Sequence, residues 1–183
     1  MLHSTKAVGH HAHAGVRRGL PRTACAALLT FALAALAQAS APPVARPAPD
    51  FVLRSLEGAN LRLSEHMGEV VMVTFWATWC GPCQQQLPAL DQLYNKYRRA
   101  GLVLLAVNID DDAVRATAMA QALKLTYPVL FDTRKEVSRA YDLGTMPLTI
   151  LIDREGVVRY VSEGYRPGFD QVYAEQLRKL LNE

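Results

Sequence analysis

Two cysteines separated by Gly-Pro, shortly after an apolar run, constrain this chain more than any other feature. The run over residues 70–75 is typical of a buried strand, and Pro82 stands where a helix can begin. Cys80 and Cys83 are therefore expected on the first turn of a helix that follows a strand. At such a turn the unpaired backbone N–H groups and the positive end of the helix dipole stabilise a thiolate. The i, i+3 spacing puts both sulfurs on one face, and this favours thiol–disulfide exchange.

Other uses of a C-x-x-C pair fit less well. A structural zinc site needs four ligands, and no second Cys or Cys/His pair follows downstream. A purely structural disulfide gains little, because the loop that it closes is very short. We therefore expect a redox-active Cys80–Cys83 disulfide, no metal and no other cofactor.

The first 39 residues have the pattern of a secretory signal peptide. A basic, acid-free start leads into an apolar, alanine-rich run, and Ala37-Gln38-Ala39 fits a small-x-small cleavage site. We expect cleavage near Ala39 and a periplasmic or otherwise extracytoplasmic protein. The alternative is an uncleaved inner-membrane anchor over residues 24–39, although the run is short for a span of ~20 residues. Cleavage would remove Cys25 and leave Cys80 and Cys83 as the only cysteines.

The formal charge of +3 does not indicate a nucleic-acid-binding protein. Four of the 20 Lys and Arg residues lie in the expected signal peptide: Lys6, Arg17, Arg18 and Arg22. The other 16 face 17 Asp and Glu, so residues 40–183 carry a formal charge of −1. No basic field remains there to attract a polyanion.

Helical patterns alternating with apolar runs predict one α/β domain over residues 50–183, after a proline-rich tether over residues 40–49. Helices alternating with buried strands imply a central mixed β-sheet with helices on both faces. Residues 110–112, all Asp, are expected to cap a helix over 112–124. The other expected elements are a hairpin over 50–63, strands over 70–75, 102–109, 128–131, 148–152 and 157–161, and helices over 81–99, 135–141 and 168–181.

With these elements in place, the chain resembles the thioredoxin superfamily, in particular its secreted TlpA/ResA-like thiol–disulfide oxidoreductases. The resemblance rests on A-P-D-F at 48–51, F-W-A-T-W-C-G-P-C at 75–83 and G-T-M-P-L-T-I-L-I-D-R-E-G at 144–156. It implies a thioredoxin-like fold with an N-terminal β-hairpin and an added helix–strand insert. It also implies a reductase of oxidised secreted proteins or of apocytochrome c, with a membrane thiol transporter as electron donor. We expect a monomer.

The resemblance also assigns roles to single residues. Cys80 would be exposed and attack a substrate disulfide, and the deeper Cys83 would resolve the mixed disulfide. A Gly81-Pro82 centre of this type suggests a potential of about −270 mV, which suits a reductase better than an oxidase. Three more residues have implied roles: Pro147 as a cis-proline facing the cysteines, Met146 as the residue whose backbone pairs with an extended substrate, and Trp79 as the aromatic that shapes the docking surface.

The chain departs from thioredoxins proper at one pair of positions. Those proteins keep a buried acid six residues before the first cysteine and a lysine partner on the adjacent strand. Here the two positions hold Thr74 and Ala106, so no buried charge is left unpaired. The proton of Cys83 then needs another acceptor, and the sequence does not identify one.

Four other functions remain as alternatives. A disulfide oxidase would differ only in potential and partners. A peroxiredoxin needs P-x-x-x-T-x-x-C, but this chain has Val73 and Ala77 in place of the proline and threonine. A thioredoxin-like copper-binding module needs C-x-x-x-C and a distal histidine, whereas His66 is the only histidine after residue 39. A non-catalytic binding domain would not need a paired C-x-x-C.

Overall fold

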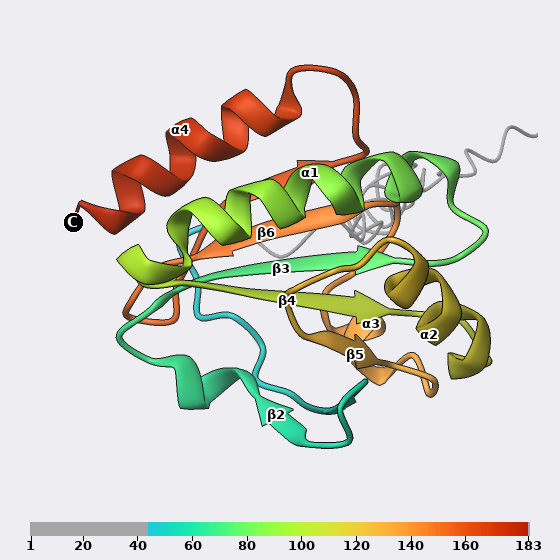
Figure 1. Cartoon of the computed structure of the whole chain (residues 1–183). Coiled ribbons are helices and arrows are strands. Elements are labelled where there is room, and N and C mark those ends of the chain that lie inside the picture. Colours follow the sequence, from blue (N-terminus) through green and yellow to red (C-terminus); the bar gives the residue numbers. More distant parts are fainter. Residues whose placement is uncertain (1–43, 183) are drawn as a thin grey trace, which may run out of the picture. The chain divides into compact units, whose positions relative to one another are not determined.

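The fold is built on one mixed β-sheet. The structure is a computed structural model that describes residues 44–182, so the expected signal peptide and Cys25 lie outside it (Figure 1). The strands follow the order β2-β1-β5-β4-β3-β6-β7 across the sheet. Their bounds are β1 (Val52–Ser55), β2 (Asn60–Arg62), β3 (Val70–Trp76), β4 (Leu102–Asn108), β5 (Val129–Phe131), β6 (Leu148–Ile152) and β7 (Val158–Glu163).

Four α-helices accompany the sheet within the described residues. They are α1 (Gly81–Tyr97), α2 (Ala113–Ala122), α3 (Glu136–Ala140) and α4 (Phe169–Leu181), with short 3-10 helices η1 (Leu63–His66) and η2 (Arg98–Ala100). The predicted thioredoxin-like fold is confirmed, including the hairpin β1–β2 and the insert α2–β5. The insert adds β5 parallel to β4, and the hairpin then pairs antiparallel with β5.

The central strand β3 is buried along its whole length because it lies between two strands and two helical layers. It pairs in parallel with β4 and antiparallel with β6. Since successive side chains of a strand point to opposite faces, Met72 and Trp76 enter one core layer while Val73 and Phe75 enter the other. A continuous apolar run is therefore what this position requires.

Helices cover both faces of the sheet, as predicted (Figure 1). One core layer contains Leu90 of α1, Ala116 of α2 and Leu177 of α4. The other contains Val137 of α3 together with Phe51 from the segment before β1. The sheet therefore holds the N-terminal end of α1 in a fixed place beside the ends of β3, β4 and β6.

Part of the expected tether lies against the domain. Ala45 N–H donates to the Val158 carbonyl at 2.8 Å, and Val158 N–H donates to the Arg46 carbonyl at 2.9 Å. The Tyr141 hydroxyl then donates to the Pro49 carbonyl at 2.8 Å. Residues 45–49 are thus bound to the domain, first at the edge strand β7 and then at the residue that follows α3.

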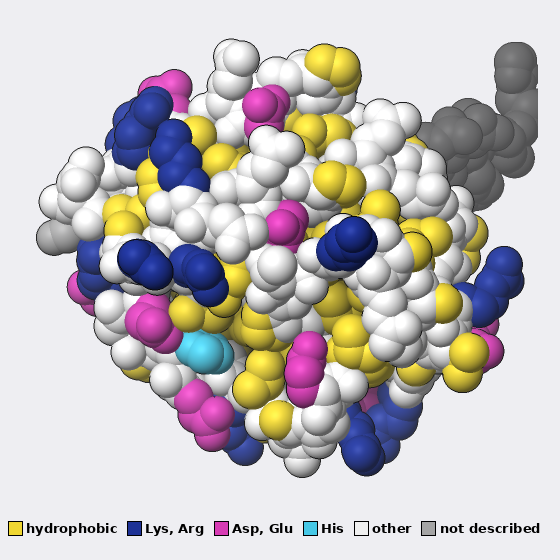
Figure 2. Space-filling view, viewed as in Figure 1, with side chains coloured by type: hydrophobic (Ala, Val, Ile, Leu, Met, Phe, Trp, Pro, Cys, Tyr) yellow, Lys and Arg dark blue, Asp and Glu magenta, His cyan; other side chains and the backbone are white. Residues whose placement is uncertain are grey.

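Charged side chains are mixed over the surface. On the face shown in Figure 2, Lys and Arg side chains alternate with Asp and Glu, with apolar side chains between them. This mixture agrees with the near-neutral formal charge of residues 40–183, and that face has no continuous basic patch that would attract a polyanion.

Candidate active site

The two cysteines are bonded to each other at the start of α1. The S–S distance is 2.01 Å and the Cα atoms of Cys80 and Cys83 lie 5.2 Å apart. Cys80 is the N-cap residue of α1, and its Sγ accepts a hydrogen bond from the Cys83 N–H at 3.2 Å. Pro82 occupies the first turn, where its missing N–H costs nothing. The sequence therefore places both sulfurs at a helix N-terminus, where unpaired N–H groups can stabilise negative charge on sulfur.

Access to the two sulfurs is unequal. Cys83 is fully buried, Cys80 exposes 6 % of its surface, and Trp79 beside it exposes 69 %. Cys80 is thus the more accessible cysteine, but it is less exposed than we expected of an attacking residue. A partner disulfide therefore has to approach Cys80 past the exposed side chain of Trp79.

The loop before β6 packs on the same core layer as the cysteines. The Met146–Pro147 peptide bond is cis. Pro147 is buried, and Met146 is half-buried against the core cluster that contains Cys80 and Cys83. The Pro147 carbonyl accepts a hydrogen bond from Gly164 N–H at 2.8 Å, which ties the loop to the residue after β7.

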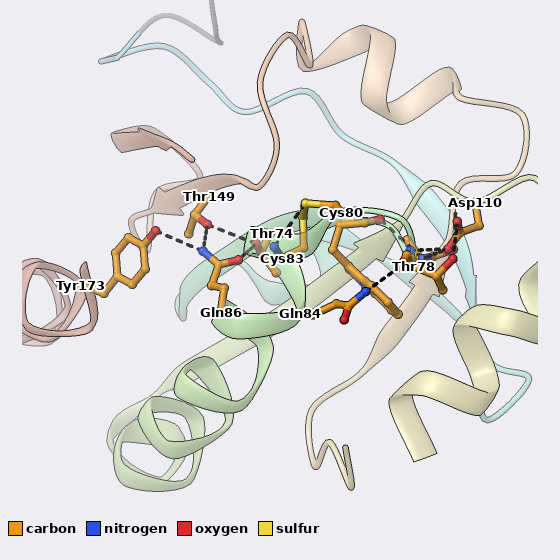
Figure 3. Close-up of a disulfide and its surroundings, with 11 residues drawn as sticks. Thr74, Thr78, Cys80, Cys83, Gln84, Gln86, Asp110, Thr149 and Tyr173 are labelled. Atoms are coloured by element: carbon orange, nitrogen blue, oxygen red, sulfur yellow. Dashed lines mark hydrogen bonds between the residues drawn. A yellow bond between two sulfur atoms is a disulfide. The ribbon is translucent and has the colours of Figure 1, made fainter. Parts of the chain in front are cut away.

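A neutral hydrogen-bond network lies behind Cys83 (Figure 3). The Gln86 Oε1 accepts from the Thr74 hydroxyl at 3.0 Å, while Gln86 Nε2 donates to the Thr149 hydroxyl at 2.8 Å and to the Tyr173 hydroxyl at 3.1 Å. All four side chains are buried. Burial raises the pKa of Tyr173, so the network is uncharged at neutral pH.

This network includes Thr74, one of the two positions at which thioredoxins proper have the acid–lysine pair. Thr74 of β3 and Ala106 of β4 are direct neighbours in the sheet, as the resemblance to thioredoxins implied. Gln86 reaches Thr74 from α1 and satisfies its hydroxyl. Neutral groups therefore stand where thioredoxins proper have a buried ion pair, and no carboxylate of residues 44–182 is hydrogen-bonded to this network.

Gln86 was not among the predicted site residues, although its position on α1 marks it as buried. Gln86 follows Cys83 by three residues and precedes Leu90 by four, so helical spacing puts it on the buried face of α1. Its two neighbours Gln84 and Gln85 are exposed. Among the three consecutive glutamines, only the helical periodicity identifies Gln86 as the buried one.

A second polar cluster holds the loop before Cys80 (Figure 3). The Asp110 carboxylate accepts from Thr78 N–H at 2.9 Å and from the Thr78 hydroxyl at 3.0 Å. The Asn108 side-chain amide donates to the same carboxylate at 2.8 Å. The prediction that residues 110–112 all cap α2 is therefore wrong in part. Only Asp112 caps the helix, accepting from Val114 N–H at 2.9 Å.

Two further features bear on the predicted chemistry. Within residues 44–182, no group of three or more His, Cys, Asp or Glu side chains is arranged to hold a metal ion. In the same part of the chain, no helix is long and apolar enough to cross a membrane.

Comparison with known proteins adds the family. Residues 44–161, more than half of the chain, match the AhpC/TSA family. The chain belongs to this family. It is 38 % identical over 125 residues to the thiol-disulfide oxidoreductase ResA of Geobacillus kaustophilus, which covers 68 % of this chain and 72 % of that protein. It is 34 % identical over 117 residues to the ResA of Bacillus subtilis, covering 64 % of this chain and 65 % of that one.

A solved structure gives the same answer at the level of the fold. The Chlorobium tepidum protein assigned as thiol:disulfide interchange protein DsbE superimposes with a TM-score of 0.73 and 34 % identity, covering 76 % of this chain and 98 % of that chain. The resemblance to ResA-like thiol–disulfide oxidoreductases is thus confirmed within the AhpC/TSA family.

Proposed function

We propose that this protein is a thiol–disulfide oxidoreductase that uses Cys80 and Cys83 to reduce disulfides of proteins outside the cytoplasm. The observation that carries the proposal is the Cys80–Cys83 disulfide at the N-terminus of α1. It is supported by the ResA relatives and by the DsbE-like fold.

The proposed reaction moves two electrons from the enzyme dithiol to the partner. The Cys80 thiolate attacks one sulfur of the partner disulfide, forms a mixed disulfide and releases one partner thiolate, which takes up a proton. The proton that Cys83 loses balances the one that the released partner thiolate takes up, and the Cys83 thiolate then attacks the Cys80 sulfur. This step forms the Cys80–Cys83 disulfide of the present structure and releases the second partner thiolate. An external dithiol must reduce the enzyme again.

The surrounding residues have proposed roles in this reaction. Gly81 and Pro82 form the turn that brings both sulfurs onto the first turn of α1. Trp79 offers an exposed aromatic surface beside Cys80. Pro147 and Met146 would receive an extended segment of the partner. In support, the Met146 backbone makes no hydrogen bond within residues 44–182, so its N–H and C=O are free to pair with a partner strand.

Direction and location form the finer part of the proposal. A thioredoxin-like centre with a potential of about −270 mV reduces protein disulfides, whereas an oxidase has a potential of about −120 mV. Oxidised secreted proteins or apocytochrome c are the proposed substrates, a membrane thiol transporter is the proposed donor, and the proposed active form is a monomer released by cleavage near Ala39. Equilibration with glutathione tests the direction, because a potential above about −180 mV would contradict a reductase.

A turnover assay tests the core of the proposal. The purified protein should accelerate the reduction of insulin by dithiothreitol, and Cys80→Ser should abolish the acceleration because the remaining cysteine, Cys83, is fully buried. Gln85→Ala, an exposed change on the same helix, is the matched control and should keep the wild-type rate. Equal activity in wild type and Cys80→Ser would contradict the assignment.

The name of the family makes a peroxidase the alternative that needs its own test. The two positions that a peroxiredoxin fills with proline and threonine hold Val73 and Ala77, which are fully buried and apolar. Neither offers a hydroxyl to a bound peroxide. We therefore expect hydrogen peroxide to oxidise the dithiol slowly, and rapid peroxide turnover would overturn the reductase assignment.

A further inference from the structure

We propose that Asp110 is a positioning residue, which holds the loop of residues 77–80 in the conformation that reacts with a partner disulfide. The proposal rests on the proposed function and adds a residue to it. The loop joins the rigid end of β3 to the first turn of α1, and Thr78 lies at its middle. Asp110 contacts this middle point rather than either cysteine.

All three polar groups of Thr78, its N–H, hydroxyl and carbonyl, are hydrogen-bonded, and two of them are bonded to Asp110. Its carboxylate accepts from the Thr78 N–H at 2.9 Å and from the hydroxyl at 3.0 Å. The Thr78 carbonyl accepts from Gln84 Nε2 at 2.7 Å. Hydrogen bonds to a charged acceptor are about twice as strong as neutral ones, so the carboxylate supplies most of the restraint.

Asp110 is itself held in place. It exposes only 7 % of its surface. Asn108, the last residue of β4, donates to the carboxylate at 2.8 Å and accepts from the Asp110 N–H at 3.0 Å. The restraint on Thr78 is thus anchored in the central sheet, which makes it rigid enough to fix the geometry of a neighbouring loop.

The two aspartates that follow Asp110 in the sequence have other partners. Asp111 makes an ion pair with Lys135 at 2.8 Å, and Asp112 caps α2. Asp111 is almost fully exposed. Three identical side chains in a row therefore have three separate partners, and only Asp110 reaches the loop. This separation provides a matched control one residue away.

The consequence concerns Trp79 and Cys80. Trp79 is exposed and has no hydrogen-bond or ring contact within residues 44–182, so its position is set by the backbone on either side of it. The backbone on one side is Thr78, and on the other it is the N-cap of α1. Loss of the restraint on Thr78 would therefore allow both Trp79 and the Cys80 sulfur to move. Small misplacements of reacting groups lower reaction rates by large factors.

Substitutions separate positioning from charge. Asp110→Ala removes all three hydrogen bonds of the carboxylate. Asp110→Asn keeps the shape, because its oxygen can accept from Thr78 N–H and Asn108 while its amide donates to the Thr78 hydroxyl. If Asp110 acts through position, Asn restores what Ala loses. If it acts through its charge on the Cys80 thiolate, Asn and Ala fail alike.

The experiment measures two quantities on purified wild type, Asp110→Ala, Asp110→Asn and the control Asp111→Asn. One is the second-order rate of insulin reduction. The other is hydrogen exchange of the Thr78 amide by NMR, which reports the restraint whether or not the protein is a reductase. We expect Asp110→Ala to slow reduction about tenfold and to speed Thr78 exchange at least about tenfold. Asp110→Asn should recover the rate to within about threefold of wild type, and Asp111→Asn should leave both quantities unchanged.

Two results would overturn the proposal. One is a wild-type rate in Asp110→Ala despite faster Thr78 exchange, and the other is a loss in Asp110→Asn as large as that in Asp110→Ala. Absence of reductase activity in the wild type would instead remove the proposed function, while the exchange measurement would still test the restraint. If Asp110→Ala does not fold, Thr78→Val removes only the hydroxyl bond, and an unchanged rate in that variant would count against the proposal.

Discussion

Two polar clusters flank the disulfide, and they are built differently (Figure 3). Behind Cys83 lies the neutral network of Thr74, Gln86, Thr149 and Tyr173, whose groups are all buried. Before Cys80 lies the carboxylate of Asp110, which is surrounded by hydrogen-bond donors. A buried charge is stable only when it is paired or well hydrogen-bonded. The loop provides such donors, whereas the interior of the sheet provides hydroxyls and one amide.

The two clusters are expected to affect different properties of the protein, one its stability and the other its reaction rate. The neutral network joins α1 to β3, β6 and α4, so it fixes the helix that carries the cysteines against the sheet. The Asp110 cluster joins one loop to the end of β4. We therefore expect changes in the network to act mainly on the free energy of unfolding, and changes in the cluster to act mainly on the reaction rate.

The largest effect is expected from a substitution that introduces a charge into the neutral network. Thr74→Asp places a carboxyl in a fully buried position without a cation, and we expect a loss of about 3–5 kcal/mol in the free energy of unfolding at pH 7. Burial raises the pKa of such a carboxyl in the folded state. Stability should therefore fall as the pH rises above about 4, where the unfolded chain ionises. Urea unfolding at pH 4 and pH 7 measures both effects, and equal stability at the two values would contradict them.

A partner cation should rescue that variant. Because Ala106 is the direct neighbour of Thr74 in the sheet, Ala106→Lys can place an ammonium next to the new carboxylate. We expect a favourable coupling of about 1–3 kcal/mol between the two changes in a double-mutant cycle. A coupling near zero would mean that this position cannot accept an ion pair.

Removing the amide at the centre of the network should have the next largest effect. Gln86→Ala leaves the hydroxyls of Thr74, Thr149 and Tyr173 with fewer partners and opens a cavity. We expect a loss of about 3 kcal/mol in the free energy of unfolding. Gln85→Ala on the exposed face should change it by less than about 0.5 kcal/mol. Similar losses in the two variants would show that the network contributes little.

The smallest effect concerns the edge of the network. Tyr173→Phe removes the hydroxyl that accepts a hydrogen bond from Gln86 and should cost about 1 kcal/mol. Because burial raises the pKa of Tyr173, the unfolded chain loses this proton first, near pH ~10, and stability then falls as the pH rises. Burial also raises the pKa of Tyr127 and Tyr141. Thermal unfolding between pH 8 and pH 11 should therefore show a shallower alkaline decline in Tyr173→Phe than in wild type, and identical slopes would contradict the shift.

Most of the fold follows from local patterns in the sequence. The apolar runs of β3 and β4 predict strands covered on both faces, and Asp153-Arg154-Glu155-Gly156 predicts the hairpin between β6 and β7. Gly156 adopts a left-handed conformation in that turn, with a φ of 77°. The disulfide pair followed from its spacing and from the helix that Pro82 begins.

The parts that sequence reasoning missed depend on contacts between distant residues. Asp110 and Thr78 are 32 positions apart, so only the parallel pairing of β3 with β4 brings them together. Local patterns predicted a cap for residues 110–112, which was right for Asp112 alone. The limited exposure of Cys80 was also missed, because it depends on the packing of Cys80 in the core cluster that contains Cys83.

Trapping with Cys83→Ser tests the central claim most directly, because this variant keeps the attacking sulfur and loses the resolving one. Incubated with an oxidised protein such as insulin, it should accumulate a mixed disulfide through Cys80, detectable by mass spectrometry and reversed by dithiothreitol. Cys80→Ser is the matched control and should accumulate far less, because Cys83 is fully buried. A mixed disulfide that forms equally well through Cys83, or none with either variant, would contradict the account.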